Sequence, residues 1–222
     1  MDLLFALFCA ALCALPAFAQ SEHAAASTPD LTGVYQAIPN DTTLTGVRKN
    51  QGSPSEIPLL PGAAQQMKDP KEDPLRMCAP VGPFRMMARD QVKFELVPAA
   101  GMIVMLFEDL SHGVMRTIHM NRGHLDKMEP LWFGDSVGKW EGDTLVVDTT
   151  GFNEKTWLNE RGAQHSDALH LVERIRPVLS GRYLEYKVTA DDSKVLTKPY
   201  TYTRYYEKVK TEITDDVCED EE

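Results

Sequence analysis

One segment of the sequence carries an arginine and a histidine within an alternating pattern. Residues 114–120 alternate in polarity, so Arg116 is expected on one face with apolar side chains and His119 on the other. An arginine among apolar side chains needs an anionic partner, because an unpaired buried charge is costly. That partner is either the carboxylate of a ligand, which Arg116 would orient, or a protein carboxylate such as Asp148 or Glu173.

A second segment places two histidines near each other. His170 and Arg174 would share one face of a strand over residues 169–177, with Glu173 on the opposite face, and His165 lies in the preceding loop. A histidine can act as a general base near neutral pH. The two histidines lie five positions apart without the spacing typical of metal ligands, so no metal site is expected. Each could equally be a surface or hydrogen-bonded residue.

Aromatic residues could contact a ring-shaped ligand. Trp132 and Trp140 lie close together in the sequence, and either could stack on an aromatic ring or fill the core. For Trp140 we favour core filling. Near the end of the chain, alternation puts Tyr202 and Tyr205 on opposite faces of a strand, and a tyrosine hydroxyl there could serve as a proton donor.

These residues must be positioned by strands. Alternating and continuously apolar segments predict about eight strands, with no long helical periodicity. They include residues 31–36, 91–96, 102–107, 144–150, 183–190 and 200–206. A short helix is expected at 62–67 after Pro61, and prolines from Pro70 to Pro83 are expected to exclude regular structure up to about Met86. The pattern predicts a mainly β fold, either an antiparallel barrel or a curved sandwich.

The composition and motifs of the chain argue against nucleic acids and cofactors as its partners. The 222-residue chain has a formal net charge of −10. An acidic surface argues against nucleic-acid binding, which needs a basic face. There is no P-loop, dinucleotide fingerprint or Cys-x-x-Cys motif, so no cofactor is expected.

The first residues have the pattern of an export signal. Residues 3–19 are almost wholly apolar and end in Ala17-Phe18-Ala19, which resembles a cleavage site. The alternative is an uncleaved segment that retains the protein at the inner membrane. The only membrane contact that we expect is through this signal.

Cleavage would leave 222 − 19 = 203 residues, which is enough for one domain. The expected organisation is a signal peptide at 1–19, a disordered tether at 20–30, a single β-rich domain at 31–219 and an acidic tail at 220–222. Two cysteines, Cys78 and Cys218, would remain after cleavage. An even number in an exported chain favours a disulfide between them, although two free thiols are the alternative.

Several segments together resemble a known family. They are RMCAPVGPFR at 76–85, RTIHMNRGH at 116–124, GDSVGKWEGDTLVVDTTGF at 134–152, HSDALHLVER at 165–174 and the pair Cys218-Glu219. They resemble a mostly uncharacterised family of secreted proteins of Gram-negative bacteria. The resemblance implies a lipocalin-like β-barrel and a periplasmic location. This chain departs from the family in its acidic tail, where the resembled proteins continue with a basic helix.

Some members of that family resemble cofactor-free decarboxylases of phenylcoumaran carboxylic acids in lignin-degrading sphingomonads. Such a reaction needs a base for a phenol, an acid for a departing ether and an arginine that orients the carboxylate. The catalytic candidates are Arg116, His119, His165 and Tyr202. The candidates for contact with a small aromatic carboxylic acid are Trp132, Trp140, Asp148, His170, Arg174 and Tyr205. The same barrel could instead carry small aromatic or apolar ligands without chemistry, or serve a structural role. The sequence leaves the oligomeric state open.

Overall fold

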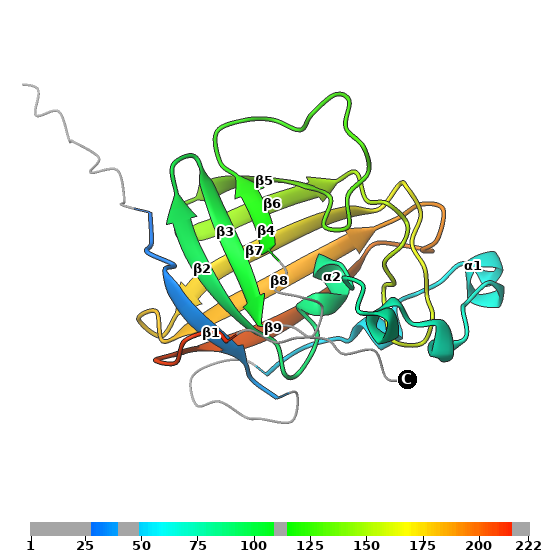
Figure 1. Cartoon of the computed structure of the whole chain (residues 1–222), viewed down its shortest axis with the longest axis horizontal. Helices are drawn as coiled ribbons and strands as arrows, with labels where there is room; N and C mark the ends of the chain where they lie inside the picture. The colour runs from blue at the N-terminus through cyan, green and yellow to red at the C-terminus, as the bar shows by residue number, and fades with distance from the viewer. Residues whose placement is uncertain (1–27, 40–48, 109–114, 215–222) are drawn as a thin grey trace, which may run out of the picture.

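The computed structural model describes residues 28–39, 49–108 and 115–214. Within them, nine strands form a closed barrel in chain order (Figure 1). The strands are β1 (Gly33–Ala37), β2 (Lys93–Ala99), β3 (Met102–Glu108), β4 (Met115–His119), β5 (Asp135–Glu141), β6 (Thr144–Thr150), β7 (His170–Val178), β8 (Tyr183–Asp191) and β9 (Tyr200–Val209). The closed barrel confirms the predicted mainly β fold and decides for a barrel against a curved sandwich.

One pair of strands departs from the predicted antiparallel pattern. Every other neighbouring pair is antiparallel, including β1 with β9, which closes the barrel. Strands β4 and β5 are parallel and pair at only two positions, Ile118 with Ser136 and His119 with Val137. The long connection over residues 120–134 returns the chain along the outside of the barrel, so that β5 starts beside β4 and runs in the same direction.

Strand alternation determines which side chains fill the barrel. On β3, Ile103, Met105 and Phe107 are buried, and the residues between them are partly exposed. Inward side chains of the other strands join the same core, for example Phe94, whose ring lies edge-on to that of Tyr206 with centroids 5.0 Å apart. The middle of the barrel is therefore occupied by packed side chains.

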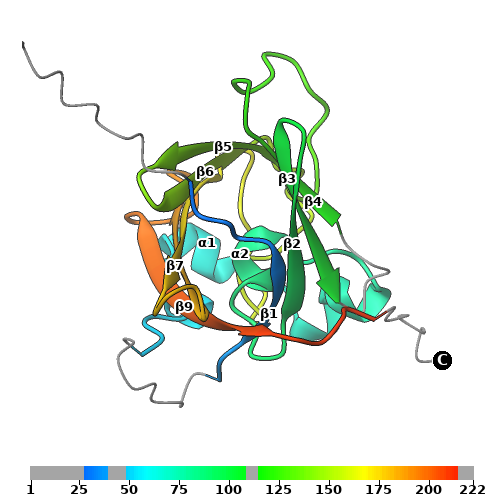
Figure 2. The ribbon, with the colours of Figure 1, turned by 90° about the vertical axis from the view of Figure 1, so that its left-hand side faces the viewer.

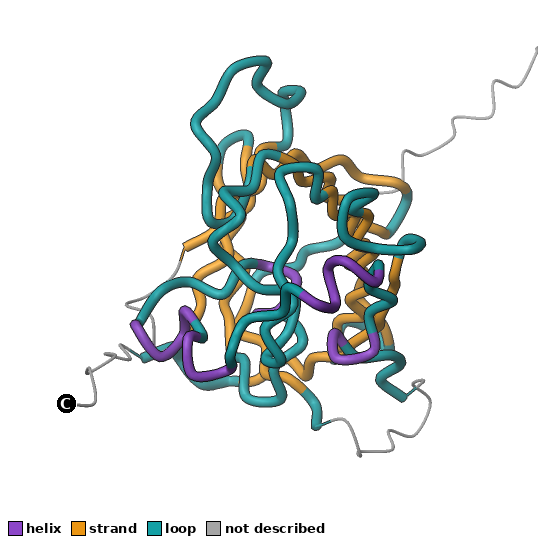
Figure 3. Tube along the Cα trace, turned by 90° about the vertical axis from the view of Figure 1, so that its right-hand side faces the viewer, coloured by secondary structure: helices purple, strands orange, loops and turns teal. Residues whose placement is uncertain are grey.

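Short helices gather at one end of the barrel (Figures 1 and 3). They are η1 (Pro54–Glu56), α1 (Pro61–Gln65), η2 (Pro70–Glu72), η3 (Pro74–Met77) and α2 (Pro83–Met86). The helix expected at 62–67 is confirmed as α1. The expectation of no regular structure up to Met86 is wrong, because each of the last three helices begins with proline at its first turn, where the missing N–H costs nothing.

Helix α2 closes this end from inside. All four of its residues are buried, and the Phe84 ring packs edge-on against Tyr202 with centroids 5.0 Å apart. The Tyr206 hydroxyl donates to the backbone carbonyl of Met87, just after the helix. Figure 2 looks into the opposite end, where the β2–β3 turn and the residues before β1 lie.

Some predictions fall outside the described residues. They are the signal peptide at 1–19, the tether at 20–30 except its last three residues, Cys218 of the expected Cys78–Cys218 disulfide, and the acidic tail at 220–222. The disulfide, the export signal and the domain limits stay predictions.

Candidate functional site

Arg116 lies inside the barrel in a dense polar network. Its side chain is 1% exposed, and its Nη1 donates to Glu173 Oε1 at 2.7 Å while Nη2 donates to Glu173 Oε2. Its Nε and Nη2 donate to Ser136 Oγ at 3.1 and 3.0 Å, and Nη2 also donates to Thr149 Oγ1 at 3.0 Å. The Tyr186 hydroxyl donates to Glu173 Oε1 at 2.7 Å. The arginine and the carboxylate therefore satisfy each other within the core.

The pKa values of Arg116 and of the Tyr186 hydroxyl are both raised in this network. Burial alone would lower the pKa of Arg116, but the charge of Glu173 and its hydrogen bond, together with smaller contributions from nearby tyrosines, raise it overall. Burial, aided by the same carboxylate, raises the pKa of the Tyr186 hydroxyl well above its usual value. The sequence left two partners open for Arg116, a ligand carboxylate or a protein carboxylate. In the structure a protein carboxylate, that of Glu173, contacts it. The role of Arg116 in orienting a substrate carboxylate stays a prediction, and in this structure its guanidinium donors have protein acceptors.

The other predicted catalytic residues lie apart. His119 is on the outer face of β4, opposite to the buried face, as alternation predicted. His165 is buried in a loop, where its Nε2 lies 2.7 Å from Thr156 Oγ1, and burial lowers its pKa. The Tyr202 hydroxyl points inward and donates to the backbone carbonyl of Phe84 at 2.5 Å. The structure does not bring the four catalytic candidates together.

Two substrate-contact candidates meet on the outer wall. His170 Nε2 lies 2.8 Å from Asp148 Oδ2, and His124 Nε2 lies 2.8 Å from Asp148 Oδ1. The other nitrogen of His124, Nδ1, lies 3.1 Å from Asp135 Oδ2. Arg122 donates to both oxygens of Asp135, at 3.0 and 2.5 Å. We call these five residues the outer His–Asp cluster.

The outer His–Asp cluster ties the 120–134 connection to the barrel. The two ring nitrogens of His124 contact two different carboxylates, so this side chain joins Asp135 to Asp148. The hydrogen bond from Arg122, opposed by burial and aided by the Leu125 amide, holds the pKa of Asp135 at about 2. Burial raises the pKa of Asp148, but hydrogen bonds from His170 and His124 outweigh it and hold that pKa below its usual value.

Sequence reasoning missed three members of this cluster. Arg122 and His124 stand in the RTIHMNRGH segment, and Asp135 stands in the GDSVGKWEGDTLVVDTTGF segment. The sequence pointed to them only in one way. Both segments belong to the family resemblance, and both carry charged residues. Their partnership depends on the parallel β4–β5 pairing, which the sequence did not predict.

Two further candidates form ion pairs or hydrogen bonds on the outside. Arg174 Nη1 donates to Glu141 Oε2 at 2.9 Å on the exposed surface. The Tyr205 hydroxyl donates to Glu185 Oε2 at 2.7 Å, beside an outer groove of about 520 Å³. Alternation correctly placed Tyr205 on the face opposite to Tyr202, but neither Tyr205 nor Arg174 lies in the barrel interior.

The open end of the barrel holds a cavity of about 630 Å³, which we call the mouth pocket. It is lined by Thr28, Pro29, Asp30, Leu31, Pro98, Ala99, Gly101, Met102, Ile103, Met120, Asn121, Lys139 and Trp140. Trp140 is partly buried against the core, as favoured from the sequence, and it also lines this pocket. Trp132 does not line it and instead lies under the Lys155 ammonium, 5.6 Å from its ring centroid.

Across the described ranges, no group of three or more His, Cys, Asp or Glu side chains could hold a metal ion. None of the helices in these ranges is long and apolar enough to span a membrane.

Comparisons with known proteins give only distant likenesses. No protein-family model and no curated protein matches the chain. A solved structure called "REP1-NXSQ fatty acid transporter" is similar over 82% of this chain and 98% of its own, with a TM-score of 0.39 and 11% identity. A point mutant of the fluorescent protein UnaG is similar over 54% of this chain and 73% of its own, with a TM-score of 0.33 and 12% identity. At these values neither likeness assigns a ligand to this chain, and the fold class stands on its own strand topology: a closed, nine-stranded β-barrel.

Proposed function

We propose that this protein is a carrier that binds a small apolar or aromatic molecule in the mouth pocket. The observation that supports this is a cavity of about 630 Å³ at the open end of a closed barrel. Pockets of roughly 300–1,000 Å³ suit small-molecule ligands. The packed side chains farther in form the floor of the pocket and hold the ligand at the end of the barrel.

The lining supports the class of ligand. Leu31, Ile103, Met120 and Trp140 offer apolar and aromatic surface, which favours an apolar body or a ring. Lys139 stands at the rim. It pairs with an exposed carboxylate at 2.9 Å and is itself 70% exposed, so the ion pair holds it only weakly. The ammonium of Lys139 can turn toward an anionic head group, and a small aromatic carboxylic acid fits this combination.

A carrier agrees better with the described side chains than a decarboxylase does. Decarboxylation would need a base, an acid and an arginine around one ligand. In this protein the donors of Arg116 have acceptors in Glu173, Ser136 and Thr149. The mouth pocket contains neither histidine nor arginine. The proposed setting is the periplasm, after export directed by the signal pattern at 1–19.

The test is ligand binding to the intact protein. Ferulate and dodecanoate, one aromatic and one aliphatic carboxylate, are titrated by calorimetry against the wild type, Trp140→Ala and Met120→Glu. Loss of the ring or introduction of a charge in the pocket should weaken binding by about tenfold or more. Trp132→Ala is the matched control, because Trp132 lies outside the pocket and should leave the affinity unchanged.

Two results would contradict the carrier. One is unchanged affinity in both folded pocket variants, with circular dichroism showing that they fold. The other is release of carbon dioxide from ferulate or a related phenolic acid, which would instead support the decarboxylase.

A further inference from the structure

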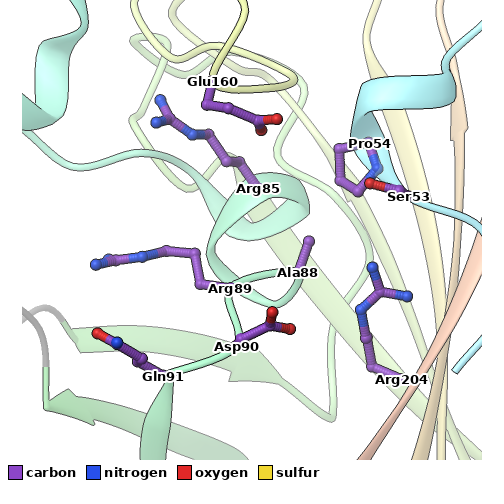
Figure 4. Close-up of a pocket in the computed structure, with 9 residues that line it drawn as sticks. All are labelled: Ser53, Pro54, Arg85, Ala88, Arg89, Asp90, Gln91, Glu160 and Arg204. Atoms are coloured by element: carbon purple, nitrogen blue, oxygen red, sulfur yellow. The ribbon is translucent and has the colours of Figure 1, made fainter. Parts of the chain in front are cut away.

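A second cavity lies at the helix-capped end of the barrel. It measures about 390 Å³ and is lined by Ser53, Pro54, Arg85, Ala88, Arg89, Asp90, Gln91, Glu160 and Arg204. Figure 4 shows these side chains around the segment that follows α2, with Arg204 reaching in from β9 and Glu160 on the other side of Ala88. Its lining is polar and charged, in contrast to the apolar mouth pocket, and shares no residue with it.

Arg204 is a buried cation with unused hydrogen-bonding capacity. It is 4% exposed, and its Nη1 donates to the backbone carbonyls of Gly52 at 2.8 Å and Thr203 at 3.1 Å. Its guanidinium lies over the Tyr202 ring, with Cζ 5.0 Å from the ring centroid. Its Nε is buried and has no acceptor among the described residues. A buried donor without an acceptor is unfavourable, so this edge of the guanidinium is suited to a ligand.

The guanidinium groups of Arg85 and Arg89, which also line the cavity, are not placed to bind a ligand as that of Arg204 is. Arg85 donates from Nη1 and Nη2 to the two oxygens of Asp73, at 2.8 and 2.5 Å. Figure 4 shows the guanidinium groups of Arg85 and Arg89 pointing to the side away from Arg204. Among the described residues, Nη1 is the only guanidinium nitrogen of Arg204 with a hydrogen-bond partner, so its Nε–Nη2 edge is available.

We propose that Arg204 binds the carboxylate or phosphate group of a small anion in this cavity. The Nε–H and one Nη2–H of a guanidinium are parallel donors, and their spacing matches two oxygens of either group. The backbone carbonyls on Nη1 and the Tyr202 ring fix the plane of the guanidinium, so little freedom is lost on binding. The cavity volume limits the ligand to a small molecule.

Glu160 adds a negative charge to the cavity that Asp90 also lines, and this bears on the selectivity of the site. Its carboxylate lines the same cavity and has no ion-pair partner among the described residues. It repels a second negative charge, so the site should prefer a singly charged carboxylate over a doubly charged phosphate. Replacing Glu160 by glutamine removes this repulsion without touching Arg204.

The test uses acetate and inorganic phosphate as separate probes, with neutral acetamide as the control. Binding is followed through the Arg Nε–H signals of the full-length protein by NMR and through calorimetry. Arg204→Lys keeps the charge but loses the paired donors, and should weaken acetate binding between about tenfold and a hundredfold. Glu160→Gln should strengthen binding of both anions, and of phosphate more.

The results that would support the Arg204 site differ from those that would overturn it. A shift of one Arg Nε–H signal with acetate that disappears in Arg204→Lys supports the site. Equal binding of acetate and acetamide, or unchanged acetate binding in a folded Arg204→Lys protein, would overturn it. If Arg204→Lys does not fold, the Glu160→Gln comparison decides, because unchanged affinity for both anions there contradicts the proposal. Trp140→Ala should leave acetate binding intact, so failure of the carrier is distinguishable from failure of this site.

Discussion

The Arg116–Glu173 pair is fully buried, so each partner depends on the other. Glu173→Gln would leave the guanidinium charge uncompensated in the core, whereas the intact pair is satisfied by several hydrogen bonds. Breaking a buried pair from one side typically costs about 3–5 kcal/mol. We expect a loss of this size in the free energy of unfolding, measured by urea denaturation.

The exposed pair of Arg174 and Glu141 is the matched control. These side chains are 44% and 41% exposed, and solvent screens their attraction. Glu141→Gln should therefore change the free energy of unfolding far less than Glu173→Gln does. Similar losses in the two variants would show that burial does not decide the strength of these pairs.

Acid should weaken the protein through Asp135. Arg122 holds the folded-state pKa of this carboxyl at about 2, below the value of about 4 expected in an unfolded chain. A carboxyl whose pKa is lower in the folded state stabilises the fold above the unfolded pKa, and this contribution is lost between about pH 4 and about pH 2. The difference in unfolding free energy between wild type and Asp135→Asn should shrink over this range. A constant difference would contradict the assignment.

At single positions, alternation predicted the face of each residue but not its partner. Arg116 was placed on an apolar face and His119 on the opposite one, and both placements are confirmed. The choice of Glu173 over Asp148 could not be predicted, because it depends on which of β6 and β7 presents a carboxylate inward. Asp148 lies on the outer face, where His170 and His124 contact it.

Strand β5 depends on a glycine at its inward position. A Cβ atom at Gly138 would lie 2.6 Å from Met120 Sδ and 2.8 Å from Ile118 Cγ2, closer than packed atoms allow. We expect Gly138→Ala to lower the free energy of unfolding by about 1–3 kcal/mol, measured by urea denaturation. The control is Gly62→Ala in α1, where a Cβ meets nothing within 4 Å and should be neutral or stabilising by up to about 1 kcal/mol. Equal effects would contradict this account of packing.

Strands were predictable where their pattern is local, and pairings were not. The alternation over 91–96 and the apolar run over 102–107 are enough to recognise β2 and β3. The β4–β5 pairing is parallel because of the path of a connection with no periodic pattern of its own. The proline-rich stretch was interpreted as irregular because of its prolines, whereas its 3-10 helices begin at proline and are capped by Asp69 and Asp73.

The mouth pocket and the charged cavity are each lined by residues from several segments of the chain. The mouth pocket combines residues 28–31, 98–103, 120–121 and 139–140, which come together only when the barrel closes. For this reason Trp140 could be named from the sequence as a ligand contact, but its neighbours could not. The apolar mouth and the charged cavity lie at opposite ends of the barrel, so the two proposed ligands need not compete.

Closure of the barrel has a consequence for self-association. Each of the nine described strands has a neighbour on both sides, so few strand edges are left to which another chain could add a strand, and the part of the β4–β5 seam beyond its two paired positions is one of them. Strand exchange would first have to separate an existing pair. The β4–β5 junction, paired at only two positions, is where such opening should begin, and strengthening it would protect the protein against aggregation.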